Sequence, residues 1–126
     1  MAAYAASSRT GSQILDDLAE VIGEEAAFAL GWEYIGLRLY IPRDPASEPG
    51  LASAVGEELA RKVCDTFHGT LIPFPHKAVI ERRVLQLADQ GKTRFDIARQ
   101  LKMRERRVYE ILQRERDRLQ GDLFDL

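Results

Sequence analysis

The chain contains few of the residues that build disulfides, metal sites and nucleophilic active sites. Its 126 residues include one cysteine, Cys64, and two histidines, His68 and His76. One cysteine excludes an intramolecular disulfide, and two histidines without a Cys, Asp or Glu grouping at ligand spacing predict no metal site. A glycine-rich phosphate loop and a G-x-S-x-G motif are also missing from the sequence. We therefore expect neither an enzyme nor a bound cofactor.

Long apolar runs are missing as well. Apolar residues make up 45% of the chain, as in a folded soluble protein, but no run approaches the ~20 residues of a membrane span. The start, MAAYAASSRTGSQ, has no basic segment followed by an apolar block, so we expect no secretory signal. Together with the single cysteine, these absences predict a cytoplasmic protein without membrane attachment.

A large excess of one charge is absent from the whole chain but present in its parts. The 18 basic and 20 acidic residues give a net charge of −2. Residues 1–76 hold 5 basic and 11 acidic side chains, whereas residues 77–119 hold 13 basic and 7 acidic ones, a net charge of +6. A basic module attached to an acidic one predicts a polyanionic partner for the basic module alone. The alternative is a solvated surface on which pairs such as Arg106/Glu110 and Glu110/Arg114 stabilise a helix.

Residues 94–113, RFDIARQLKMRERRVYEILQ, have the pattern of a helix-turn-helix. Apolar residues at helical spacing on either side of a short turn supply its buried face: Ile97, Ala98, Leu101, Met103, Val108, Ile111 and Leu112. The side chains expected to be exposed on the second helix can reach base edges and phosphates in a major groove: Arg104, Glu105, Arg106, Arg107, Tyr109, Glu110 and Gln113. Among these, an arginine can bind guanine, and Gln113 can bind adenine. The pattern therefore predicts binding to double-stranded DNA.

The first helix of this motif is expected to begin at a phosphate-binding site. Thr93 and Asp96 form the expected N-cap pair. Backbone donors and the helix dipole favour an anion beside Lys92, Thr93 and Arg94. We predict Lys92, Arg94 and Arg99 as phosphate anchors that position the motif on the duplex.

The remaining helix ends and the turn of the basic module are predicted from its glycines and capping residues. A helix from about Lys77 to Gln90, ended by Gly91, is expected to precede the motif. Lys102 stands where turns of this kind commonly carry glycine. The lysine therefore has to adopt the backbone geometry of the turn or shift it. The second helix is expected to run from near Arg104, a poor N-cap residue, to about Leu119.

Residues 18–42 and 51–75 are related by an internal duplication with an offset of 33 residues. Positions that are identical in the two copies include Leu18/Leu51, Ala19/Ala52, Gly23/Gly56, Glu24/Glu57, Glu25/Glu58, Ala27/Ala60, Gly36/Gly69 and Pro42/Pro75. Two copies are too few for a solenoid. Each copy instead predicts a helix, a glycine stop and a short strand.

The duplicated region predicts two helices and two strands. The first helix is expected from about Gln13 to Trp32, with Thr10 in a capping box, and the second from about Leu51 to Phe67. The alternation in residues 37–41, LRLYI, predicts a strand. Residues 70–74 predict a weaker second strand, whose proline suits an edge position.

These elements predict a mostly α fold with a short β-ribbon. We expect a flexible N-terminus in residues 1–12, a dimerisation domain in 13–76, a helix-turn-helix domain in 77–119 and an acidic tail in 120–126. A two-stranded ribbon with two helices is a small core, so we expect a homodimer in which two chains complete it. The expected dimer core comprises Leu18, Ile22, Leu37, Leu39, Ile41, Val55 and Leu59. The alternative is an intramolecular ribbon in a monomer.

Over residues 14–118 the chain resembles the Mor/C transcription activators of Mu-like phages. The resemblance depends on IGEEAAFAL, GLRLYIPR, GEELARKVCDTFHG and the module ending in RRVYEILQR. It implies an intertwined homodimer that reads an imperfect inverted repeat and contacts RNA polymerase at the nucleoid of a bacterial host. It also implies strand contacts to the minor groove, for which the candidates are Gly36, Arg38, Tyr40, Gly69 and Thr70. Pro73 stands where the second copy would carry the tyrosine.

Three functional classes follow from these patterns. A dimeric activator binds an inverted repeat and recruits RNA polymerase. A non-activating DNA-binding protein, such as a repressor or a phage packaging recognition subunit, binds DNA without contacting polymerase. A protein-docking module uses its basic helices on an acidic protein and does not select DNA. The residues favour the first two classes, and the resemblance favours the first.

Overall fold

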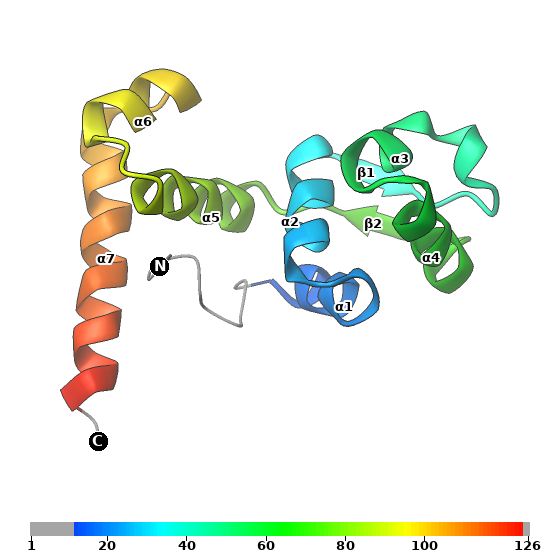
Figure 1. Cartoon of the computed structure of the whole chain (residues 1–126), viewed down its shortest axis with the longest axis horizontal. Coiled ribbons are helices and arrows are strands. Elements are labelled where there is room, and N and C mark those ends of the chain that lie inside the picture. Colours follow the sequence, from blue (N-terminus) through cyan, green and yellow to red (C-terminus); the bar gives the residue numbers. More distant parts are fainter. Residues whose placement is uncertain (1–11, 125–126) are drawn as a thin grey trace. The chain divides into compact units, whose positions relative to one another are not determined.

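The structure is a computed structural model in which residues 12–124 are described (Figure 1). Within that range the chain forms two compact units, residues 12–79 and residues 80–124. The predicted mostly α fold with a short two-stranded ribbon is confirmed. All of the predicted N-terminal segment except Ser12 lies outside the described residues, as do the last two residues of the predicted tail.

The helices of the N-terminal unit are interrupted where we predicted continuous ones. The expected first helix consists of α1 (Gln13–Ile22) and α2 (Glu24–Glu33), and the expected second consists of α3 (Pro49–Val55) and α4 (Glu57–Phe67). The breaks lie at Gly23, with φ 91° and ψ 158°, and at Gly56, with φ 88° and ψ 162°. Residues other than glycine rarely adopt this conformation. The duplication therefore repeats a helix–glycine–helix–strand unit, joined by a short 3₁₀ helix, η1 (Pro45–Ser47).

The strands β1 (Arg38–Tyr40) and β2 (Leu71–Pro73) pair antiparallel within one chain. Leu39 lies opposite Ile72, its equivalent in the duplication, so the ribbon has a local pseudo-two-fold axis. The Phe74 amide donates to the Leu37 carbonyl at 2.8 Å, which leaves the next pair, Arg38 and Pro73, without mutual backbone hydrogen bonds. The nitrogen of Pro73 therefore lies on the open edge, where a donor is not needed.

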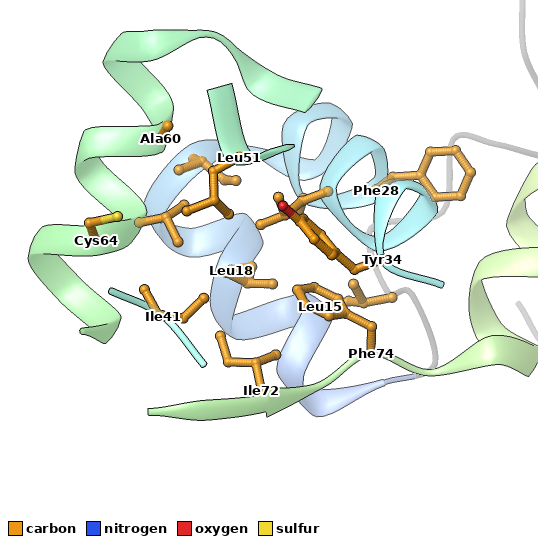
Figure 2. Packing of buried hydrophobic residues seen from close by; sticks show 14 of the residues in the cluster. Leu15, Leu18, Phe28, Tyr34, Ile41, Leu51, Ala60, Cys64, Ile72 and Phe74 are labelled. Carbon is orange, nitrogen blue, oxygen red and sulfur yellow. The ribbon is translucent and has the colours of Figure 1, made fainter. Parts of the chain in front are cut away.

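The two copies close one apolar core, shown in Figure 2. Side chains with at most 1% exposure come from all four helices, from β2 and from the residue directly after β1: Leu15, Leu18, Leu30, Ile41, Leu51, Val63, Cys64 and Ile72. The rings of Tyr34 and Phe74 stack with centroids 5.7 Å apart, and the Tyr34 hydroxyl donates to Glu48 Oε2 at 2.9 Å. Burial, with this hydrogen bond, raises the pKa of Tyr34 above its ordinary value, and burial also raises the pKa of the Cys64 thiol.

This core contains most of the residues predicted for a dimer core. Leu18, Ile22 and Ile41 are buried within the single chain. Three others are half-buried at the edge of the same cluster: Leu39, Val55 and Leu59. Leu37 alone of the set is exposed, at 58%. The chain thus closes the core that we expected two chains to share, and it forms the intramolecular ribbon considered as the alternative.

The C-terminal unit is built from three helices around a second apolar cluster. These are α5 (His76–Asp89), whose first four residues belong to the N-terminal unit, α6 (Arg94–Leu101) and α7 (Glu105–Phe124). Helix α7 continues five residues past the predicted end at Leu119, so residues 120–124 are helical and not a tail. No proline lies in this stretch, and a single glycine, Gly121, is tolerated in a helix.

Candidate nucleic-acid interface

The connection from α5 to α6 fixes where the candidate interface begins. Gly91, with φ 88°, ends α5, and the amides of Gly91 and Lys92 donate to the carbonyls of Ala88 and Leu87, both at 3.0 Å. Thr93 then caps α6, because its Oγ1 accepts from the Asp96 amide at 3.1 Å. Thr93 is confirmed as the N-cap, with Asp96 contributing its backbone amide to the predicted pair. The free backbone donors of α6 begin directly beside Lys92.

The turn between α6 and α7 is formed by Lys102 in the left-handed conformation, with φ 56° and ψ 46°. Within residues 12–124 it is the only residue other than glycine with a positive φ. The Met103 amide donates to the Ala98 carbonyl at 2.9 Å and closes the turn. The lysine therefore adopts the geometry that glycine commonly supplies, at a cost of roughly 1–2 kcal/mol.

One side of the helix-turn-helix packs against α5 as predicted. Ile97 and Val108 are completely buried, and Ala98 and Ile111 are at most 8% exposed. The residues at the rim of the cluster are half-buried: Leu101, Met103 and Leu112. With one side closed in this way, the opposite side of α7 is open to solvent.

The open side of α7 gathers most of the predicted DNA-binding residues. Tyr109 is 45% exposed, and the side chain of Arg106 is 89% exposed. Helical spacing places these residues on the same side: Glu105, Arg106, Tyr109, Glu110 and Gln113. Five residues from the starts of both helices line one shallow hollow: Arg94, Glu105, Arg106, Tyr109 and Glu110. The fold therefore brings the predicted anchor Arg94 beside the predicted base-reading residues.

Charged pairs organise this open side. Arg94 Nε lies 3.9 Å from Glu105 Oε1, and the Arg94 guanidinium lies 5.2 Å from the centroid of the Tyr109 ring. Arg106 Nε lies 3.2 Å from Glu110 Oε1, so the Arg106/Glu110 pair considered from the sequence is formed. Gln113, which was predicted to be exposed, is half-buried, and its side chain donates to Asp117 at 3.0 Å. Arginines and glutamates thus alternate across the hollow, and neither charge dominates it.

Arg107 departs from the predicted set. Its Nη2 lies 3.5 Å from Glu81 Oε1 of α5, and Arg114 Nη1 lies 2.9 Å from the same oxygen. Arg107 therefore helps to join α7 to α5 and lies on the flank of the open side. The pair Glu110/Arg114 considered from the sequence is replaced by Arg114/Glu81. Only the packing of α5 against α7 selects this partner, so helical spacing alone could not identify it.

The remaining predicted anchors are exposed cations. Lys92, Arg99 and Arg104 are exposed, and within the described part of the chain Lys92 and Arg104 form no ion pair. The Arg99 guanidinium lies 5.9 Å from the ring centroid of Phe95, which is 62% exposed. Sequence reasoning missed Phe95, although an aromatic residue outside the apolar spacing of α6 was a visible signal.

The candidate strand contacts lie in the N-terminal unit. All five are exposed: Gly36, Arg38, Tyr40, Gly69 and Thr70. Tyr40 is 62% exposed and lies opposite Leu71, which is 53% exposed. The open face of the ribbon is therefore mainly apolar, with Arg38 as its basic residue.

Residues 12–124 contain neither a metal-binding cluster nor a membrane-spanning helix. No cluster of three or more His, Cys, Asp or Glu residues there could hold a metal ion. None of the helices in that range is both long and apolar enough to cross a membrane. Comparison of the chain with models of protein families, with curated proteins and with solved structures finds no match. Function is therefore inferred from the geometry of the helix-turn-helix.

Proposed function

We propose that the chain is a sequence-specific DNA-binding protein that acts through α6, the Lys102 turn and α7. The observation that carries this proposal is the two-sided character of the motif. One side is closed by Ile97 and Val108, while the other presents Arg106, Tyr109 and neighbouring polar side chains at the start of a helix. A helix presented in this way fits a major groove with its first residues at the base edges.

The contacts in the complex follow from the chemistry of the exposed side chains. The start of α6 approaches the DNA backbone, where Lys92 and Arg94 contact phosphates beside the free amides of the helix. Arg99, in the last turn of α6, contacts a further phosphate. Arg104 and Arg106 are the candidates for guanine, and Gln113 is the candidate for adenine. Phosphate contacts set the register of the protein on the duplex, and base contacts select the sequence.

We further propose that the protein acts as a homodimer on an inverted repeat and activates transcription by contacting RNA polymerase. The resemblance to the Mor/C activators supports this part. The acidic balance of residues 1–76 and the apolar open face of the ribbon, with Tyr40 and Leu71, suit contacts with protein and not with DNA. A repressor would bind the same DNA without polymerase contact, and a reconstituted transcription assay separates the two.

The DNA-binding proposal is tested by titrating a selected duplex with wild-type protein and with Arg106→Ala. We expect at least a tenfold loss of affinity, because one bidentate guanine contact is worth about 1–3 kcal/mol. Arg61→Ala in α4 removes another exposed arginine, from the N-terminal unit, and serves as the control. Equal affinity of wild type and Arg106→Ala would mean that the open side of α7 does not face the DNA.

The phosphate anchors have a different signature from the base-reading residues. Lys92→Ala should lower the slope of log K against log salt by about 0.9, the value for one lost phosphate contact, and leave the preferred sequence unchanged. A changed sequence preference with an unchanged slope would instead assign Lys92 to base recognition.

A further inference from the structure

Two ion pairs occupy the surface that the proposed function places against DNA. Arg94 and Glu105 connect α6 to α7 at 3.9 Å, and Arg106 and Glu110 are paired along α7 at 3.2 Å. Tyr109 lies in the same hollow, 5.2 Å from the Arg94 guanidinium. Each arginine of the hollow therefore faces a carboxylate.

These pairs are placed differently from the charged contacts that join the helices. Glu81 is 25% exposed and binds both Arg107 and Arg114 at the flank, where α5 meets α7. By contrast, Glu105 and Glu110 are 53% and 48% exposed. Exposed pairs of this kind contribute little to stability, so these two ion pairs add little to the fold. Their position is best explained by what approaches the hollow.

A carboxylate on this surface weakens binding to DNA of any sequence but strengthens binding to sites with particular bases. It is repelled by phosphates and by the acceptor atoms of guanine and thymine, but it accepts a hydrogen bond from the N4 amino group of cytosine. While paired, it also neutralises the arginine that would otherwise bind any phosphate. An arginine and a glutamate four residues apart on a helix are close enough to reach neighbouring base pairs.

We propose, on the basis of the DNA-binding function above, that Glu105 and Glu110 are specificity-determining residues. On random DNA they stay paired with Arg94 and Arg106 and neutralise them. At a half-site that offers a partner to both the arginine and the glutamate, the ion pairs break and the arginines bind DNA. Such a half-site contains G·C pairs, in which Arg106 binds a guanine and Glu110 accepts from a cytosine amino group on the neighbouring pair.

The test compares Glu110→Gln and Glu105→Gln with wild type in two assays. The first selects binding sites from randomised duplexes. In Glu110→Gln we expect one position to change from cytosine to adenine, because glutamine binds the N6/N7 edge of adenine. The second titrates a random-sequence duplex at about 0.1 M salt. Both variants should bind it several-fold more tightly, with a salt slope steeper by about 0.9 for each freed arginine.

Glu58→Gln is the matched control, because it makes the same change of charge at an exposed position of α4 in the N-terminal unit. If it strengthens binding to random DNA as much as Glu110→Gln does, net charge explains the effect and the inference is wrong. Unchanged base preference and unchanged random-DNA affinity in Glu110→Gln would also overturn it, while leaving DNA binding intact. Failure of the wild-type protein to bind any duplex would overturn the proposed function itself.

Discussion

The two units of this chain use similar apolar side chains to different ends. In the N-terminal unit, two copies of a helix–glycine–helix–strand element bury side chains from all four helices and from β2 in one core. In the C-terminal unit, three helices bury a smaller set on one side and leave the other side of α7 polar and open. The comparison teaches that the first unit closes its apolar side chains into a core, whereas the open charged side of the second makes it the better candidate for the recognition surface proposed above.

The largest expected effects come from removing buried volume in each unit separately. Ile97→Ala in the C-terminal core and Leu18→Ala in the N-terminal core should each cost about 2–5 kcal/mol of unfolding free energy, because both residues are completely buried. Trp32 is the single tryptophan of the chain and lies in α2, so its fluorescence reports on the N-terminal unit. We expect Ile97→Ala to lower the urea midpoint seen by circular dichroism but not the midpoint of Trp32 fluorescence.

Leu18→Ala should instead lower the midpoint of Trp32 fluorescence. If both variants shift both signals equally, the two clusters unfold as one cooperative unit, and the division of the chain into two units fails.

A smaller effect is expected at the two glycines that break the helices. Gly23→Ala and Gly56→Ala should each destabilise the N-terminal unit by about 1–3 kcal/mol, because both glycines have a φ near +90° that alanine adopts only under strain. The space around both is open, so the strain is confined to the backbone. Denaturant unfolding measures the loss, and similar losses at the two positions would support the structural duplication.

Gly121→Ala is the control for these variants, because Gly121 lies within α7 with open space around it, and alanine should be neutral or slightly stabilising there. If Gly121→Ala lowered the free energy of unfolding as much as Gly23→Ala does, replacing any glycine would be harmful. The effect could then not be assigned to the backbone conformation of Gly23 and Gly56.

The smallest effect is expected at the turn of the recognition surface. Lys102→Gly should stabilise the C-terminal unit by about 1 kcal/mol, since glycine removes the strain of a left-handed lysine. Thermal unfolding followed by circular dichroism measures the gain. Destabilisation by glycine would show that the lysine side chain contributes contacts worth more than the strain, and Lys102→Asn then distinguishes side-chain contacts from backbone preference.

The sequence predicted best what depends on local spacing. The apolar side of the helix-turn-helix, the Thr93 cap and the two strand regions follow from periodicities and capping residues that a single sequence displays. The breaks at Gly23 and Gly56 were missed because the apolar spacing continues across them, since both helices of each copy pack on the same core. A glycine within such a pattern is compatible with a continuous helix, and only its backbone angles show that the helix is interrupted.

Contacts between helices were the harder part of the candidate site. Arg107 and Arg106 are adjacent in the sequence and equally plausible for DNA, yet α5 supplies Glu81 to one and leaves the other exposed. In the same way, Leu18 and Ile41 fit a dimer core by pattern, but the second copy of the duplication buries them within the chain. Both outcomes depend on tertiary partners that spacing does not encode.

The most direct test of the central claim is the selection of binding sites from randomised duplex DNA by the purified protein at about 0.1–0.15 M salt. The account predicts enrichment of an inverted repeat with half-sites about one helical turn apart, which is the spacing of a dimer that presents two recognition helices. Absence of any enriched sequence would contradict it, and the basic unit would then be a surface for an acidic protein.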